Sequence, residues 1–507
     1  TQTTAPIQLR PLWLQKVDEE VWQTAVSTAT PSEFLVMLTT QADLSAAAAL
    51  PDKDAKGRYV YEQLTAVAQQ TQPALRAQLQ ALGVPFRSFW IANMIWVRGN
   101  QDTIATLAQR PDVAHIFANP SVQFNRPETA VLPQSATSVT GVEWSLTHVG
   151  ADSVWAMGIT GDGVVVGGQD TGYDWEHPGL INQYRGWDGA IADHNYNWHD
   201  AIHENNPNTA IGNPCGFDAA APCDDHSHGT HTMGTMAGND LDAADPDWPG
   251  GAANAVGMAP GARWIGCRNM EEGYGTPATY AECYEWFVAP YPVGGDPMTD
   301  GDPAKAPHVI NNSWGCPPLE DCTDPNVLIA VVGNVRAAGI VTVHSAGNYG
   351  SSSCSTIMDP AAIYDSSFTV GNTTSSDTIS SSSSIGPVTV DGSNRLKPDI
   401  TAPGSGIRST IPNGSYATFS GTSMAGPHVA GLVALLISAN PSLAGDVDAI
   451  EQIIRETAVP LTTTKTCGGD TPTSVPNHVF GYGRIDALAA ITSMFPYHTF
   501  LPLVQSE

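Results

Sequence analysis

Three short motifs contain the residue types of a nucleophilic hydrolase. Asp170 stands in Gln-Asp-Thr-Gly, His228 in His-Gly-Thr-His, and Ser423 in Gly-Thr-Ser-Met-Ala-Gly-Pro-His. A serine hydroxyl is a poor nucleophile until a neutral imidazole accepts its proton, and a buried carboxylate must hold that imidazole in the right tautomer. Together the three residues predict a Ser-His-Asp catalytic triad.

The elements expected around these residues place them at strand ends and helix starts. Residues 163–168 (GVVVGG) predict a buried parallel strand that leads into Asp170, and open α/β sheets build their sites at the carboxyl ends of such strands. His228 is expected to open a helix over 228–237. Ser423 begins a strongly apolar helix, so its hydroxyl lies at the positive end of the helix dipole.

Strands and helices alternate through residues 146–490, which we interpret as one large domain. Short apolar strands are expected at 308–312 and 340–344, and a further helix at 446–457. The pattern predicts an α/β fold, a parallel sheet with helices on both faces. No stretch reaches the ~18 apolar residues of a membrane span, and the apolar segment 429–439 predicts a buried helix.

A smaller domain is expected at residues 32–126. Its predicted order of elements is β-α-β-(β)-α-β, which is that of a split βαβ, or ferredoxin-like, α+β fold. The strands are expected at 33–39, 89–97 (a strand pair or one long strand) and from 115, and the helices at 59–82 and 101–109. The remaining parts are an N-terminal extension (1–31), a Pro/Ser/Thr-rich linker (127–145) and a C-terminal tail (491–507).

Charge divides the chain at about residue 126. Residues 1–126 carry ten basic and ten acidic side chains, which leaves 11 of the 21 basic and 40 of the 50 acidic residues for the remainder. The whole net charge of −29 therefore lies in the second part. Such a surface repels nucleic acid and anionic lipid, so we expect a soluble monomer with no nucleic-acid or membrane partner.

Eight cysteines all follow residue 214, and their even number predicts disulfides in a secreted protein. The short steps from Cys215 to Cys223 and from Cys316 to Cys322 are typical of loop staples, and we expect a local bridge in the second pair. The rest of the connectivity stays open, and free buried thiols in a cytosolic enzyme are the alternative. No basic-then-apolar leader opens the sequence, so any signal peptide is expected to have been removed.

In their chain order, the three motifs resemble those of the subtilisin-like serine peptidases, the subtilases (family S8). The order Asp, His, Ser is the one known for subtilisin. The resemblance covers nearly all of residues 146–490, and the Asn-Ser-Trp-Gly stretch with the cysteine-bearing insertions is most similar to the bacillopeptidase F-type branch. It also rests on GMAPGA (257–262), VINNSWG (309–315), SAGN (345–348), KPDITAPG (397–404) and GRIDA (483–487).

The resemblance implies a role for each matched residue. Ser423 attacks the scissile carbonyl, His228 acts as general base and then as general acid, and Asp170 orients His228. Asn348 matches the amide of the oxyanion hole, which works together with the backbone N–H of Ser423. Loss of such a donor costs about 3–4 kcal/mol of transition-state stabilisation.

The resemblance also implies how substrate is held. Ser313, Trp314 and Gly315 match the strand that pairs with the substrate backbone. Many subtilases have a smaller residue where Trp314 stands, so we expect altered walls of the substrate groove. Protein or peptide substrates follow from the family, and no cofactor is required for catalysis. Structural Ca²⁺ is common in the family and the acidic part permits it, although no ligand loop stands out.

Residues 32–126 resemble the inhibitor propeptides of the same enzymes in element order and placement. This resemblance implies a zymogen, in which the propeptide is an intramolecular inhibitor whose tail lies in the active site. Ser423 is then expected to cut the chain between about Asn125 and Gly141, in an exposed segment of the kind that peptidases prefer. An unrelated accessory domain is the alternative.

Other interpretations remain open at this point. Asp-Thr-Gly also occurs in aspartic peptidases, but a second copy in matching context is missing. His226, His228 and His231 could form a metal cluster, but they lack the Glu of H-E-x-x-H, so no metal ligand is expected and His231 and His428 are expected to be structural. A catalytically weak subtilase-fold binding module and a dedicated processing peptidase are the alternatives to a secreted serine endopeptidase.

Overall fold

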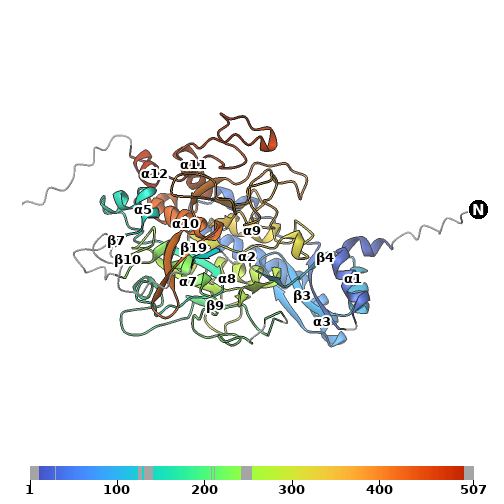
Figure 1. Cartoon of the computed structure of the whole chain (residues 1–507). Coiled ribbons are helices and arrows are strands. Elements are labelled where there is room, and N and C mark those ends of the chain that lie inside the picture. The colour runs from blue at the N-terminus through green and yellow to red at the C-terminus, as the bar shows by residue number, and fades with distance from the viewer. Residues whose placement is uncertain are drawn as a thin grey trace, which may run out of the picture.

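The chain forms two regions that lie side by side (Figure 1). We call residues 12–123, blue in Figure 1, the N-terminal unit, and residues 141–495 the main domain. The first ten residues, most of the predicted linker and the last twelve residues fall outside the described part. The computed structural model describes residues 11–28, 30–123, 128–130, 141–206, 208–209, 212–240 and 254–495.

A seven-stranded parallel sheet forms the centre of the main domain, with strand order β17-β16-β15-β14-β8-β11-β9. Alternate residues of a strand point to opposite faces, and both kinds are apolar here: Val309 packs into one core and Ile310 into the other. Both faces are therefore buried, as parallel sheets require. The strands are β8 (Val165–Asp170), β9 (Trp198–Asp200), β11 (Arg263–Arg268), β14 (Val309–Asn312), β15 (Val341–Ser345), β16 (Phe368–Thr373) and β17 (Ile400–Pro403).

Helices cover both faces of this sheet, which confirms the predicted α/β class. α7 (His228–Ala237) and α10 (Thr422–Ala439) pack on one face, and α8 (Pro277–Val288) and α9 (Ile329–Ala337) on the other. Only α10 among the described helices is long and apolar enough to cross a membrane, and 89% of that stretch is buried in protein. The remaining helices on its face are α5 (Trp144–His148), α6 (Ala151–Trp155), α11 (Val447–Glu456) and α12 (Ala487–Ser493).

The N-terminal unit contains a four-stranded antiparallel sheet of order β2-β3-β1-β4, with the predicted split βαβ sequence of elements. The helical region expected at 59–82 is two helices, because Pro73 lacks an N–H and begins the second of them. The region 89–97 contains a turn between two strands. The elements are β1 (Ser32–Leu38), α2 (Lys53–Thr71), α3 (Pro73–Leu82), β2 (Phe86–Phe89), β3 (Met94–Gly99), α4 (Gln101–Ala108) and β4 (Val113–Ala118).

The two faces of this antiparallel sheet have different neighbours. Phe34 and Val36 of β1 pack into a core with α3, α4 and α1 (Glu19–Ser27), a helix that the sequence analysis placed in an extension without assigned structure. Leu35, between them, belongs with Trp96 and Phe117 to the core that contains α8 and α9 of the main domain. One face of the sheet is thus completed by a different part of the chain.

Four disulfides link all eight cysteines, and every one of them lies in the main domain. The expected local bridge between Cys316 and Cys322 is present, and Cys215 pairs with Cys223. The other bridges join Cys267 to Cys283 and Cys354 to Cys467. The last spans 113 residues and ties the segment before α12 to the loop after β15.

Candidate active site

Asp170 and His228 meet where β8 ends and α7 begins. Nδ1 of His228 lies 2.6 Å from Oδ1 of Asp170, and both side chains are 1% exposed. The carboxylate also accepts the backbone N–H of Thr171 at 2.8 Å and the hydroxyl of Thr232 at 3.2 Å. These donors fix the carboxylate, which in turn orients the imidazole with Nε2 on the side away from Asp170.

Asp224 connects the loop before His228 to the residue after Asp170. Its carboxylate accepts the backbone N–H groups of His226 and Ser227, each at 2.9 Å, and of Thr230 at 3.0 Å. It also accepts the hydroxyl of Thr171 at 2.9 Å. Sequence reasoning missed this residue, although an Asp shortly before an expected helix start is a familiar signal for capping.

Ser423 lies in the first turn of α10, which packs against α7. Its carbonyl oxygen accepts the hydroxyl of Ser313 at 3.0 Å, which anchors the start of the helix to the end of β14. Its own Oγ is buried and makes no hydrogen bond to a described residue, His228 included. Hydrogen bonds between catalytic residues often tighten only when substrate is bound.

Asn348 follows β15 and faces the start of α10. Its Oδ1 accepts both the backbone N–H of Thr422 at 3.0 Å and the Thr422 hydroxyl at 3.1 Å. Because the amide oxygen is engaged, the amide nitrogen is the atom left to donate, as stabilisation of an oxyanion requires. Asn348 and Ser423 line one pocket together with Trp314 and Gly315, so the structure brings these predicted residues together.

Trp314 is a wall of this pocket and is itself almost fully buried. Its ring stacks on Tyr280 with centroids 3.9 Å apart and meets His344 edge-on, and the residue is 3% exposed. The hydroxyl of Tyr280 donates to the carbonyl of Gly315 at 3.3 Å. The large side chain therefore supports the adjacent backbone from behind.

The tail of the N-terminal unit approaches this pocket as an added strand. β5 (Val122–Gln123) pairs antiparallel with β13 (Tyr274–Gly275), and Gln123 lines the pocket with Ser423. The backbone N–H of Gln123 donates to Glu320 at 2.7 Å. Sequence reasoning missed β13, because two residues show no periodicity.

A second piece of the same segment pairs beyond the pocket. β6 (Glu128–Ala130) is antiparallel to β19 (Ser415–Ser420), which ends three residues before Ser423. The segment from the end of the N-terminal unit onward is thus paired with the main domain at β13 and again at β19. The predicted processing window from Asn125 to Gly141 lies outside the described residues, apart from the backbone of 128–130 and Gly141.

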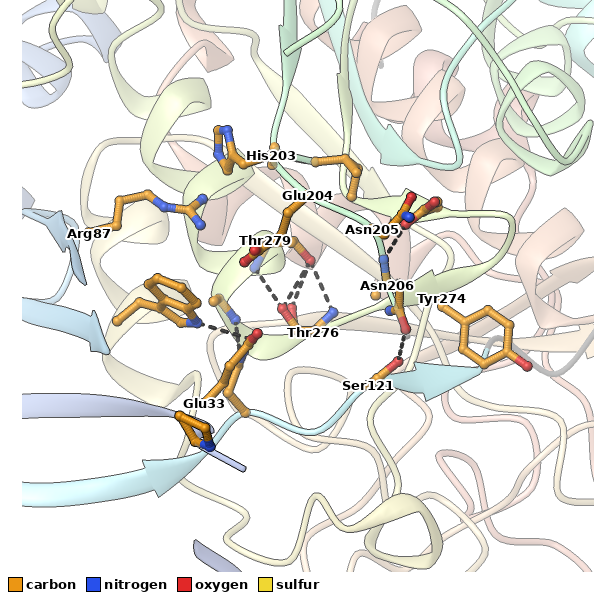
Figure 2. A pocket seen from close by; sticks show the side chains of 18 residues that line it. Glu33, Arg87, Ser121, His203, Glu204, Asn205, Asn206, Tyr274, Thr276 and Thr279 are labelled. Carbon is orange, nitrogen blue, oxygen red and sulfur yellow. Dashed lines mark hydrogen bonds between the residues drawn. The ribbon is translucent and has the colours of Figure 1, made fainter. Parts of the chain in front are cut away.

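Polar contacts link the N-terminal unit to α8. Figure 2 shows Arg87 near His203, and Ser121 bonded to Asn206, whose oxygen accepts its hydroxyl at 2.8 Å. Arg87 and His203 both contact the buried carboxylate of Glu282, at 2.5 and 2.8 Å. Burial alone would raise the pKa of Glu282, but Arg87 and His203 outweigh it and hold that pKa well below its usual range.

Trp90 is a fully buried contact of the N-terminal unit with the main domain. The residue is 0% exposed, and its indole N–H donates to the carbonyl of Pro297 at 3.0 Å. The backbone N–H groups of Trp90 and Ile91 donate to one oxygen of Glu285, at 2.5 and 2.9 Å. Glu282 and Glu285 of α8 thus accept hydrogen bonds from β2 and from the turn that follows it.

The other histidines have structural contacts. His231 stacks on Phe419 and lies 3.1 and 3.2 Å from two carbonyl oxygens, and burial lowers its pKa to about 3. His428 contacts the carbonyl of Met424 and the hydroxyl of Ser145. Within the described ranges, the group whose ligand atoms gather as a metal site would need is Asp18, His115 and Asp324, far from these histidines in sequence.

Comparison with known proteins adds an independent finding. The model of the subtilase family matches residues 161–483, a span that contains all three predicted triad residues. Bacillopeptidase F from Bacillus subtilis (strain 168) is 35% identical over 418 residues, which cover 80% of this chain and 26% of that protein. The chain therefore spans about a quarter of the length of bacillopeptidase F.

Shorter relatives align over most of their length. Subtilisin E from Bacillus subtilis (strain 168) is 29% identical over 339 residues, which cover 67% of this chain and 71% of that protein. The thermophilic serine proteinase from Bacillus sp. (strain AK1) is 28% identical over 402 residues, which cover 79% of this chain and 78% of that protein.

Proposed function

The chain belongs to the subtilase family of serine peptidases, and from this premise we propose that it is a secreted serine endopeptidase whose triad is Asp170, His228 and Ser423. The observation that carries the proposal is the 2.6 Å contact between His228 and Asp170, in a fold that brings Ser423 and Asn348 to one adjoining pocket. Neither a binding module nor a structural domain requires this combination.

The proposed reaction uses only groups of this chain and water. The Ser423 hydroxyl adds to the carbonyl carbon of the scissile bond while His228 takes its proton. Asn348 and the backbone N–H of Ser423 donate to the resulting oxyanion. His228 then protonates the leaving nitrogen, the C–N bond breaks, and an acyl-enzyme remains. Water, deprotonated by His228, hydrolyses the ester and restores the Ser423 hydroxyl.

Digestion of a proteome-derived peptide mixture tests the activity. We expect internal peptide bonds to be cut, in reactions that a serine-directed inhibitor stops and a chelator of transition metals leaves intact. Loss of all cleavage with the chelator would overturn the triad mechanism. A processed protein that cuts nothing in the mixture would favour a catalytically weak binding module, and cuts confined to a single sequence would favour a dedicated processing peptidase.

We further propose that the N-terminal unit is a propeptide that inhibits the main domain. Its support is the pairing of β5 with β13 and of β6 with β19, together with the place of Gln123 in the pocket that Ser423 lines. A segment docked in this way enters the site as a substrate does, by adding a strand. Ser423 then cuts its own chain, in the window from Asn125 to Gly141, and the released unit stays bound until it is degraded.

The Ser423→Ala protein tests self-processing. Expressed in a host without other peptidases, it should fold and keep all 507 residues, whereas the unsubstituted protein should yield an N-terminal fragment of about 125–141 residues and an acidic remainder. Intact mass and N-terminal sequencing distinguish the two. Normal cutting of the Ser423→Ala protein would mean that another enzyme performs the step.

Secretion is proposed from the cysteines. Four disulfides without a free thiol are typical of proteins that mature in an oxidising compartment. Protein purified without reductant should show no alkylatable thiol, whereas eight such thiols would contradict this localisation. We also propose that the enzyme acts as a monomer, which light scattering of the processed protein tests.

A further inference from the structure

The pocket beside Ser423 has a carboxylate among its lining residues. Asp359 lines it together with Asn348, Gly315 and Ser423, so the pocket adjoins both the predicted nucleophile and the predicted oxyanion donor. A substrate whose carbonyl reached these two groups would place the side chain on the amino side of the scissile bond, the P1 side chain, at this pocket. Asp359 is 2% exposed.

Glycines allow this carboxylate to lie against the pocket wall. A Cβ on Gly315 would stand 2.8 Å from Oδ1 of Asp359, and one on Gly347, whose φ is +97°, would stand 2.9 Å from Oδ2. Any larger residue at either position would displace the Asp359 side chain. The two backbone segments that carry the substrate strand and Asn348 are therefore shaped around a carboxylate.

Asp359 has donors but no cation. Its Oδ1 accepts the backbone N–H of Cys316 at 3.2 Å and the hydroxyl of Tyr349 at 3.0 Å. No Lys, Arg or His of the described residues lies within 4 Å of its oxygens. A second carboxylate, Glu320, is close enough to act on it electrostatically, which makes the site more negative.

Most other buried carboxylates of the described chain do have a cationic or histidine partner. Burial of an unpaired charge is costly, so buried acids are usually paired. Besides Asp359, the exceptions are Glu271, which accepts backbone and hydroxyl donors, and Glu285, which accepts two N–H groups of the N-terminal unit. The paired ones are Asp170 with His228, Asp200 with Arg268, Glu282 with Arg87, Asp399 with Lys397 and Glu451 with Arg336.

We propose that Asp359 is the residue that determines P1 specificity, and that the enzyme prefers substrates with Arg or Lys at P1. The cation that Asp359 lacks is supplied by the substrate, whose guanidinium or ammonium group donates to this carboxylate in the pocket wall. Glu320, which already accepts the backbone N–H of Gln123, adds to the negative potential. This inference rests on the proposed peptidase function and names its substrate class.

The preference for Arg at P1 should depend on pH, because it requires the ionised form of Asp359. Burial raises the pKa of Asp359, the donors from Tyr349 and Cys316 lower it and Glu320 raises it, with a net pKa of about 7. Tyr280 is the other titratable group near it. A bound cation favours the ionised carboxylate, so the preference for Arg should grow as pH rises through about 7 and then level off.

Two peptides that differ only at P1 test the proposal, one with arginine and one with citrulline, which has the same shape without the charge. The processed enzyme should cleave the arginine peptide with a kcat/KM about 30-fold higher or more, because loss of one partner of a buried charge pair costs about 2 kcal/mol or more. Asp359→Asn should bring this ratio to within a few-fold of one. A P1 leucine peptide, measured with both proteins, distinguishes a loss of the arginine preference from a general loss of activity.

Two further variants complete the test, one as a matched control and one with a smaller expected effect. Asp365→Asn removes the same charge six positions away from an exposed side chain and should keep the ratio. Glu320→Gln removes the second carboxylate and should lower the ratio by less than Asp359→Asn does. The ratio in the unsubstituted enzyme should rise between pH 6 and pH 8, centred on the pKa of about 7.

The outcomes distinguish a failure of the proposed role of Asp359 from a failure of the proposed peptidase function. A ratio near one in the unsubstituted enzyme, or a ratio that Asp359→Asn leaves unchanged, would overturn the role of Asp359 while the peptidase function stands. If neither peptide is cleaved, the peptidase function fails, and benzamidine, an uncleavable cation, then decides the pocket. It should raise the melting temperature of the processed protein and not that of a folded Asp359→Asn variant, and equal shifts would contradict the proposal.

Discussion

The two sheets of this molecule are completed in different ways. The seven-stranded parallel sheet of the main domain has helices of its own region on both faces. The four-stranded antiparallel sheet of the N-terminal unit has its own helices on one face, while Leu35, Trp96 and Phe117 on the other pack with α8 and α9. The sheet of the N-terminal unit therefore needs the main domain to cover one of its faces, whereas the parallel sheet has helices of its own region on both faces.

Covalent links and charge follow the same division. All four disulfides lie in the main domain, and the whole net charge of −29 lies after residue 126, whereas residues 1–126 are neutral and free of cysteine. The main domain is cross-linked by disulfides, whereas the N-terminal unit is joined to it by non-covalent contacts and by the peptide chain between them. This difference fits the proposal that the N-terminal unit is a removable inhibitor.

The largest predicted loss of activity comes from substitution of Asp170, at the buried end of β8. Asp170→Asn keeps the shape of the side chain but favours the wrong tautomer of His228, so kcat for peptide cleavage should fall about 10⁴-fold. The N-terminal unit should still dock, because Asp170 makes none of its contacts. An Asp170→Asn enzyme with activity within tenfold of the unsubstituted one would contradict the assigned triad.

A smaller loss is expected at the oxyanion donor. Asn348→Ala removes one amide from the pocket, and kcat should fall about 10²–10³-fold with little change in KM, because the donor acts in the transition state. Steady-state kinetics on a single peptide measure both constants. An effect on KM alone would show that Asn348 only binds the substrate.

Two tryptophans of the N-terminal unit lie on opposite faces of its sheet, and their substitution tests which face holds the unit to the main domain. Trp90→Ala removes the anchor buried against Pro297, and a buried anchor is worth about 2 kcal/mol or more, so the released unit should inhibit the main domain about 30-fold less well. Trp22→Ala removes a side chain of α1 that packs on the opposite core, beside Trp13.

Inhibition after processing measures this difference, as the delay before full activity appears. The Trp90→Ala protein should activate faster than the unsubstituted one, and Trp22→Ala, the matched control, should change the delay much less. Equal delays for the two variants would mean that the face with Trp90 does not hold the inhibitor.

Loss of single disulfides should change stability and not the chemical step, and is measured as the free energy of unfolding in an inactive Ser423→Ala background. Cys354 and Cys467 close a loop of 113 residues, for which loop entropy predicts about 4.7 kcal/mol. Cys316 and Cys322 close a loop of six, which predicts about 2 kcal/mol. Serine pairs at the first bridge should therefore destabilise the main domain more, and the reverse order would show that strain or local contacts dominate.

Sequence reasoning reached the fold class, the split βαβ order and the short bridge from Cys316 to Cys322 because each rests on a local pattern. The spacing of apolar residues, together with the Pro and Gly residues that end elements, locates strands and helices. The motifs around Asp170 and Ser423 lie at element ends, where the chain must turn. The helix break at Pro73 was missed, although proline at the first helical position is a start signal that could have shown it.

Other features could not be predicted, because they depend on contacts between residues that are far apart in the sequence. Asp359 stands in an unremarkable Met-Asp-Pro stretch, and only the packing of Gly315 and Gly347 against it reveals a carboxylate at the pocket. β13 is two residues long, and its role follows from pairing with β5. The second face of the N-terminal sheet looks like an ordinary core from sequence, because apolar alternation does not say which region covers it.

The central claim is that Ser423 is the nucleophile, and a fluorophosphonate probe tests it most directly. The processed enzyme should take up one label, which peptide mapping by mass spectrometry should place on Ser423, and His228→Ala should abolish that labelling because the hydroxyl then loses its base. A label on another residue, or labelling of Ser423 that persists at the same rate in His228→Ala, would contradict the account.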